Sequence, residues 1–188
     1  MPRKYDLGRR AAAAEDTRRR IVDATVALHA EQGILATSYK DVARRADVGI
    51  GTVYNHFPTL DDLVTACGSQ TRESAQPPDP AVIAAPRTRR ARVERLVADV
   101  FAWYERYPSW RRGLADADKL ESLARGVRAR EDHLRALVHA ALGPDAEAVT
   151  AATLRALIDY EVFRSLFDSG LTTSEAADRV VAVLRSGI

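Results

Sequence analysis

The stretch from Asp41 to Leu63, DVARRADVGIGTVYNHFPTLDDL, constrains the fold more than any other part of the chain. A short basic helical pattern is followed by two closely spaced glycines, Gly49 and Gly51. A second segment of about two helical turns then runs to Pro58, which ends it because proline cannot continue a helix. Two short helices joined by a tight turn are typical of a helix-turn-helix motif.

Local signals place the helices around this motif. Ile21, Ala24 and Leu28 recur at helical spacing, which predicts a longer first helix. Ser38 and Asp41 have the spacing of a capping box, which places the start of a second helix beside them. We therefore predict helices at about 16–32, 39–46, 50–57 and 60–73.

The chemistry of such a motif accounts for the two glycines. Its third helix has to lie in a DNA major groove about 12 Å wide, and residues without a Cβ let the backbone approach closely. Thr52, Asn55 and His56 can then bond phosphates or bases, while Val53 and Phe57 hold the helix on its core. The stretch therefore predicts a DNA-binding surface.

The composition is ordinary for a soluble globular protein. Of 188 residues, 46% are hydrophobic and 29% are charged, with a net charge of +2. No apolar run approaches the ~20 residues of a membrane helix, and MPRKYDLGRR at the N-terminus lacks the apolar core of a secretory signal. The single cysteine, Cys67, excludes an internal disulfide framework. We expect a cytoplasmic protein that does not enter a membrane.

The first twenty residues carry a local excess of positive charge. Seven of them are Arg or Lys and three are Asp or Glu, which leaves an excess of four. We interpret this segment as a flexible arm. It is either a solvated tail or a segment that follows the minor groove of DNA, as arms do in other helix-turn-helix proteins.

The rest of the chain is also helical in pattern. Residues 76–87, QPPDPAVIAAPR, hold four prolines in twelve positions and indicate a linker. Further helical patterns cover about 88–106, 115–141, 145–169 and 173–186, and we find no strand and no internal repeat. We predict an all-α protein with an arm and helix-turn-helix domain at 1–75, a linker at 76–87 and a larger helical domain at 88–188.

The N-terminal residues resemble the DNA-binding domain of TetR-type transcriptional regulators. The match covers about a third of the chain. The matching positions are Ile21, Ala24, Leu28, Gly33, Thr37, Val42, Ala43, Ala46, Val48, Gly51, Thr52, Val53, Tyr54, His56, Phe57 and Leu63. The resemblance implies double-stranded DNA with a twofold-symmetric operator as the partner. Asn55 would read a base, and Lys40 would reach a base edge or a phosphate. The full set of implied DNA contacts is Ser38, Tyr39, Lys40, Gly49, Ile50, Gly51, Thr52, Tyr54, Asn55 and His56.

Three positions depart from the family pattern. Gly49 stands where the family usually has Ser or Thr, so a cap hydroxyl is missing. Leu60 stands where a phosphate-binding Lys is frequent, and His29 where Phe is common. Two implied contacts also have a structural alternative, in which Tyr54 packs on the first helix and His56 only ends the third.

The last two helical patterns suit an interface. Helix 145–169 has two apolar faces, which have to be covered twice, by the chain's own core and by a partner. The resemblance implies a homodimer through a twofold four-helix interface. The alternative is that both faces belong to the intramolecular core. The expected interface residues are Leu154, Ile158, Val162, Leu166, Ala177, Val180, Val181 and Leu184.

Aromatic residues concentrate in FAWYERYPSW, residues 101–110. They are candidates for a pocket that binds a small apolar or aromatic effector, which the resemblance places in the second domain. Core packing explains such a cluster equally well. The candidate pocket residues are Phe101, Tyr104, Trp110, His133, Tyr160 and Phe163.

Three functions compete. The first is a homodimeric DNA-binding regulator, most simply a repressor that a small molecule controls. The second is an enzyme, but the four histidines and one cysteine show no catalytic, metal-ligand or phosphate-loop spacing, and we expect no cofactor and no metal. The third is a helical protein-interaction module with a degenerate DNA-binding head.

Overall fold

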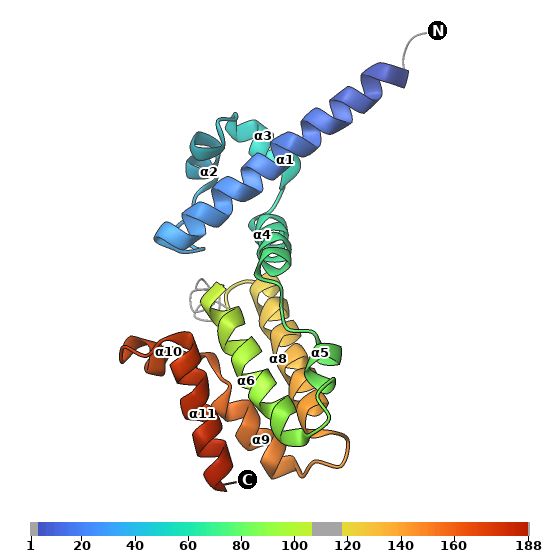
Figure 1. Ribbon diagram of the computed structural model, residues 1–188. Coiled ribbons are helices and arrows are strands. Elements are labelled where there is room, and N and C mark those ends of the chain that lie inside the picture. Colours follow the sequence, from blue (N-terminus) through green and yellow to red (C-terminus); the bar gives the residue numbers. More distant parts are fainter. Residues whose placement is uncertain (1–3, 107–117, 188) are drawn as a thin grey trace. The chain divides into compact units, whose positions relative to one another are not determined.

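The chain folds entirely into helices and irregular segments where the structure describes it. The computed structural model describes residues 4–106 and 118–187, and every regular element in these ranges is a helix (Figure 1). Its contacts form two compact units. We call the first, with residues up to Arg72 and residues 118–127, the head domain. The second, from Glu73 to Arg106 and from Arg128 onward, is the C-terminal domain. The all-α prediction is confirmed.

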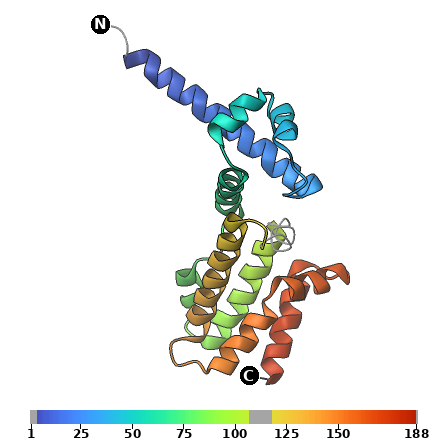
Figure 2. The same cartoon turned by 180° about the vertical axis from the view of Figure 1, so that it is seen from behind.

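Four helices build most of the head domain. They are α1 (Lys4–Gln32), α2 (Tyr39–Ala46), α3 (Ile50–His56) and α4 (Leu60–Ala75). α2 and α3 lie along the C-terminal half of α1 in both views (Figures 1 and 2). The core between them holds Ile21, Val42, Val53, Phe57 and Leu63, each with at most 2% of its surface exposed. The predicted bounds of α2 are confirmed, and α3 ends one residue earlier than predicted.

The prediction of a flexible arm is wrong. α1 begins at Lys4, so the basic segment that precedes Ile21 is already helical. The four consecutive alanines Ala11–Ala14 explain this, because alanine has the highest helix propensity. A helix that is nucleated by packing at its C-terminal half also extends readily, one hydrogen bond for each residue added.

Two capping boxes fix the starts of α4 and of the last helix. The Thr59 hydroxyl accepts the Asp62 backbone N–H at 3.1 Å, and the Asp62 carboxylate accepts the Thr59 N–H at 3.1 Å. Thr172 and Glu175 make the same pair of bonds, at 3.3 and 2.8 Å, before the last helix. Each box satisfies backbone donors that a helix start leaves without partners.

The C-terminal domain packs around α6. Its helices are α5 (Pro80–Ala84), α6 (Arg89–Arg106), α8 (Glu121–Leu142), α9 (Ala148–Leu157), α10 (Tyr160–Asp168) and α11 (Thr173–Gly187). α6 contacts α5, α10 and α11. The first residues of α8, up to Val127, belong to the head domain, and the helix continues without a break into the C-terminal domain.

The proline-rich segment at 76–87 is not a free linker, so this prediction is also wrong. The segment contains α5, whose N-cap Asp79 accepts the Ala81 backbone N–H at 2.8 Å. Pro80 occupies the first helical position, where a missing N–H costs nothing. Ile83 is fully buried in the core of the C-terminal domain, so this segment is part of that domain.

The single helix predicted at 145–169 is wrong as well, because the chain forms α9 and α10 with a break at Ile158 and Asp159. Asp159 caps α10 by accepting the Glu161 backbone N–H at 3.0 Å. The same carboxylate lies 3.1 Å from Arg155 and 3.8 Å from Arg130, whose side chain is only 3% exposed. A buried guanidinium needs anionic partners, and the break brings Asp159 to it.

None of the helices in the described ranges is long and apolar enough to cross a membrane.

Candidate nucleic-acid interface

The start of α2 is fixed by Ser38. Its hydroxyl accepts the Asp41 backbone N–H at 3.2 Å and donates to the Asp41 carboxylate at 2.5 Å. The carboxylate also accepts the Ser38 N–H at 3.4 Å. The hydrogen bond from Ser38 holds the pKa of Asp41 below its usual range. Ser38 is exposed and so is Lys40 in the first turn of α2, so both side chains remain accessible to a ligand.

In the turn between α2 and α3, the residue with a left-handed backbone conformation is an aspartate and not a glycine. Asp47 has φ 53°, whereas Gly49 has φ −69°, which any residue adopts. A Cβ at Gly49 would come no closer than 3.7 Å to Thr52, and one at Gly51 would meet nothing within 4 Å. The fold therefore does not need glycine at either position, and the absent side chains leave the backbone of α3 open.

The outer face of α3 presents a compact set of side chains. Ile50 is 48% exposed and Tyr54 is 52% exposed, and Gly51 and Asn55 are exposed beside them. On the other face Val53 is fully buried. Thr52 and His56 are half-buried at the edges of this outer face. These residues of α3, together with Ser38, Tyr39 and Lys40 of α2, form one surface, which we call the recognition face.

Tyr39 joins α2 to the end of α3. Its hydroxyl donates to the Phe57 carbonyl at 2.9 Å, and its ring lies 4.6 Å from that of Tyr54. Partial burial raises the pKa of Tyr39, with smaller contributions from Tyr54 and Asp62. The Tyr54 ring lies against α2 and stays half exposed. No sequence signal marks the Tyr39–Phe57 bond, which joins residues distant along the chain.

Three arginines of α1 and α2 make contacts within the head domain. Arg44 pairs with Asp41 at 2.6 Å, and Arg45 bonds Glu31 through two nitrogens at 2.9 and 2.6 Å. The Arg18 guanidinium lies 5.1 Å from the centre of the Phe57 ring, a cation–π distance. The guanidinium groups of Arg44 and Arg45 are exposed, so these two ion pairs contribute little to stability.

Two titratable groups lie beneath the surface in the head domain. His29 is 9% exposed, and burial lowers its pKa to about 4. Cys67 is 5% exposed, and burial raises the pKa of its thiol to about 12. The imidazole is thus neutral and the thiol protonated near pH 7, which suits an apolar core.

The first turn of α4 holds the start of α8 within the head domain. One carboxylate oxygen of Asp61 accepts the Ser122 backbone N–H at 2.8 Å, and the other lies 3.3 Å from Arg125. The hydrogen bonds from Ser122 contribute most, and Arg125 less, to holding the pKa of Asp61 below its usual range. Leu60, next to it, is half-buried.

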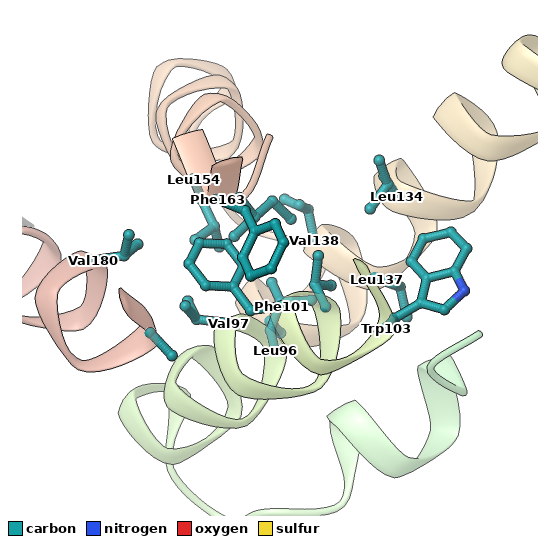
Figure 3. Packing of buried hydrophobic residues seen from close by; sticks show 14 of the residues in the cluster. Leu96, Val97, Phe101, Trp103, Leu134, Leu137, Val138, Leu154, Phe163 and Val180 are labelled. Carbon is teal, nitrogen blue, oxygen red and sulfur yellow. The ribbon is translucent and has the colours of Figure 1, made fainter. Parts of the chain in front are cut away.

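The candidate effector residues come together in the C-terminal domain. Phe101, Tyr104, Tyr160 and Phe163 are each at most 3% exposed. The rings of Phe101 and Phe163 meet edge to face with their centres 5.2 Å apart, within the cluster of buried side chains (Figure 3). Tyr104 and Tyr160 meet edge to face, also at 5.2 Å. The cluster is closely packed, as the core-packing alternative requires.

Two other candidates lie apart from this centre. The His133 ring nitrogen is 2.9 Å from the Pro78 carbonyl, and its ring is 6.0 Å from Trp103. Trp110 lies outside the described residues. The structure does contain a groove of about 530 Å³ between α6 and α11, but other residues line it, including Ala98, Ala102 and Val181.

Most of the expected dimer-interface residues face inward. Leu154 and Ile158 expose none of their surface, and Ala177, Val180, Val181 and Leu184 expose at most 9%. These six side chains belong to the core of the C-terminal domain. Val162 and Leu166 are half-buried against that core. The exposed large apolar side chains on the last three helices are different ones, Val149, Phe167 and Val183.

No group of three or more His, Cys, Asp or Glu side chains in the described ranges is placed to hold a metal ion. What the geometry defines is a helix-turn-helix protein with a second, helical domain.

Comparison with known proteins identifies the helix-turn-helix. Residues 21–67 match the model of the family described as bacterial regulatory proteins, tetR family. The chain is 38% identical over 73 residues to the HTH-type transcriptional repressor KstR of Mycolicibacterium smegmatis, which covers 38% of this chain and 36% of that protein. It is 47% identical over 54 residues to KstR of Rhodococcus jostii, 29% of this chain and 26% of that protein. The chain thus matches about a third of the length of these relatives or less. The match to the tetR family model therefore concerns the helix-turn-helix domain.

The solved structures extend the likeness in fold to the whole chain. The multidrug binding protein EbrR, complexed with imidazole, covers 99% of this chain and 93% of its own at a TM-score of 0.65 and 23% identity. FadR of Bacillus subtilis, in complex with stearoyl-CoA, covers 90% of this chain and 98% of its own at a TM-score of 0.59 and 17% identity. At these identities the likeness concerns the fold.

Proposed function

We propose that the protein is a sequence-specific DNA-binding transcriptional regulator, and specifically a homodimeric repressor whose DNA binding a small-molecule effector controls. One observation carries the proposal. Lys40, Ile50, Gly51, Tyr54 and Asn55 are exposed together on a surface whose inner side is firmly packed. The curated relatives of the head domain are named transcriptional repressors, which favours repression.

The recognition face divides by chemistry into reading and positioning groups. Asn55 carries an amide, which can bond adenine through both its donor and its acceptor. Tyr54 and His56 can donate to phosphate oxygens, which position a protein without specifying sequence. Ile50 offers an apolar contact suited to a thymine methyl group. Gly51 permits the close backbone approach.

The proposed homodimer uses the outer faces of the last three helices. Val149 on α9 is 75% exposed, Phe167 on α10 is 38% exposed and Val183 on α11 is 57% exposed. A partner that covered these side chains would remove their apolar surface from water, which favours association. A twofold dimer would present two head domains, and it would therefore bind a twofold-symmetric operator.

The proposed effector is a small apolar or aromatic molecule, bound in the C-terminal domain at the cluster of Phe101, Tyr104, Tyr160 and Phe163. These rings are buried, so an effector would have to separate them and stabilise an opened conformation. Trp103 stacks on Tyr104 with ring centres 5.6 Å apart, which offers a fluorescence signal for its binding. The names of the solved neighbours mention small bound molecules, which agrees with a ligand-binding second domain. We place the protein in the cytoplasm and assign it no enzymatic activity.

The proposal is tested by selecting binding sites from a random duplex pool and titrating the winning site at two salt concentrations. We expect a twofold-symmetric site and an affinity that falls steeply with salt, because phosphate contacts release counterions. Asn55→Ala should lose preference at one base pair of each half-site, about 1–3 kcal/mol of discrimination. Ser69→Ala, an exposed position of the head domain that bonds only its own helix, is the control.

If no sequence is enriched and binding equals that of a charge-matched protein, DNA reading is ruled out. The helical interaction module then becomes the better account.

A further inference from the structure

The N-terminal half of α1 is a surface that the recognition face leaves unused. From Gly8 to Arg20 every residue is exposed except half-buried Thr17. From Gly8 onward, the first buried residue of the helix is Ile21. At a rise of 1.5 Å per residue, Arg9 lies roughly 18 Å along the axis from Ile21. A rod of this length extends well past the packed part of the head domain.

The charge of this rod is positive. From Lys4 to Arg20 it holds six Lys or Arg and three Asp or Glu, a net charge of +3. Asp16 pairs with Arg19 and lies 3.8 Å from Arg20. Nearer the N-terminus, Arg9 and Arg10 are both exposed. Exposed ion pairs contribute little, so these guanidinium groups are available to phosphate, which they bind through parallel hydrogen bonds.

The rod leaves the head domain at the edge of the recognition face. Arg18 lies over the ring of Phe57, the residue that ends α3. Both views show α1 continuing past α3 toward its N-terminus (Figures 1 and 2). A ligand on the outer face of α3 that continued in this direction would meet Arg10 and Arg9.

A helix is too thick to follow the minor groove. With its side chains an α-helix is about 10–12 Å across, whereas the minor groove is about 6 Å wide. The sequence-based hypothesis of a minor-groove arm therefore does not fit a helical segment. A membrane surface fits poorly as well, because Tyr5 and Leu7 are the only large apolar residues from Lys4 to Arg20.

We propose that the N-terminal half of α1 is a second DNA-contact surface, which lies across the phosphates of the duplex flanking each half-site. Arg9 and Arg10 make contacts there that do not depend on base sequence. This inference rests on the proposed DNA-binding function. Because roughly 18 Å corresponds to about five base pairs at 3.4 Å each, the protein requires more duplex than its recognition helices cover.

The experiment compares the selected operator alone with the same operator extended by ten arbitrary base pairs on each side. We expect wild type to bind the extended duplex several-fold more tightly. The double variant Arg9→Gln/Arg10→Gln should lose this advantage and keep its base preference. The slope of log affinity against log salt concentration should be shallower for this variant than for wild type, by about one for each phosphate that it no longer binds. Arg87→Gln/Arg89→Gln removes the same charge from exposed positions of the C-terminal domain and should behave as wild type.

A third variant separates helix from charge. Ala12→Pro keeps every arginine but interrupts the helix, so it should also lose the advantage of the extended duplex. If Ala12→Pro retains it, a flexible arm makes the contact and the helical surface is ruled out. If wild type shows no preference for the extended duplex, the inference fails although operator recognition stands, whereas failure to select any operator removes both. Binding to phosphatidylglycerol vesicles that the double variant loses, without any effect of flanking DNA, overturns the proposal in favour of a membrane surface.

Discussion

At the residue scale, the buried imidazole of His29 makes the stability of the head domain depend on pH. Burial lowers its pKa to about 4, against about 6.5 in an unfolded chain. The unfolded state therefore binds the proton more readily, so the folded state is fully stable above pH 6.5 and loses stability as pH falls toward 4. The loss amounts to roughly 3 kcal/mol below that pH.

His29→Phe should remove this part of the pH dependence, because phenylalanine has no proton to bind. Urea unfolding followed by circular dichroism at pH 7, 5.5 and 4.5 measures it as the difference between wild type and variant. The exposed His139, changed to Gln, controls for loss of a histidine. Parallel stability curves for wild type and His29→Phe would mean that the imidazole is not buried.

Two tyrosines in contact should differ in their roles. The Tyr39 hydroxyl donates to the Phe57 carbonyl, so Tyr39→Phe should lower the free energy of unfolding by about 1 kcal/mol. Tyr54 is half exposed, so Tyr54→Phe should leave stability unchanged and weaken DNA binding, because the variant cannot donate to a phosphate. Thermal unfolding and operator titration of both variants test this, and equal effects on stability would contradict it.

At the element scale, helix starts could be predicted wherever their cause is local. Ser38 with Asp41, Thr59 with Asp62 and Thr172 with Glu175 form their boxes within four residues of sequence. The break between α9 and α10 could not be predicted, since neither glycine nor proline marks it and its cause lies on α8. Arg130 is distant in sequence from Asp159, and only the folded chain brings their charges together.

Asp159→Ala should therefore destabilise the C-terminal domain. It removes the cap of α10 and one anionic partner of a guanidinium that is 3% exposed. Because Glu131 still lies 3.3 Å from Arg130, we expect a loss of about 2 kcal/mol rather than the full cost of an unpaired buried charge. Asp168→Ala, which removes an exposed carboxylate from the end of the same helix, should cost less than about 0.5 kcal/mol. Thermal unfolding that gave both variants equal melting temperatures would refute this role of Asp159.

At the scale of the whole molecule, the recognition face and the apolar surface of the last helices differ in how far sequence determines them. The outer face of α3 follows from one short pattern, because Val53 and Phe57 define its buried side. The last helices have more apolar surface than one core can cover, and sequence alone does not say which part stays exposed. The structure assigns most of the predicted interface residues to the core and leaves Val149, Phe167 and Val183 outside.

This exposure makes the proposed dimer testable. Val183→Glu places a charge on a side chain that is already 57% exposed in the single chain, so this variant should keep its melting temperature at high dilution. Phe167→Glu also removes a ring that lies 5.7 Å from that of Phe163, so its melting temperature should fall, but the variant should still fold. Charges in an apolar interface are costly unless they are paired, so both variants should sediment as monomers at concentrations where wild type is a dimer. Binding to a twofold operator should then fall by orders of magnitude, because two linked heads bind far more tightly than one, while binding to a single half-site should change little.

The control is Val82→Glu, which changes an exposed apolar position of α5 and should remain dimeric. Dimeric sedimentation of both α10 and α11 variants would place the interface elsewhere on the chain.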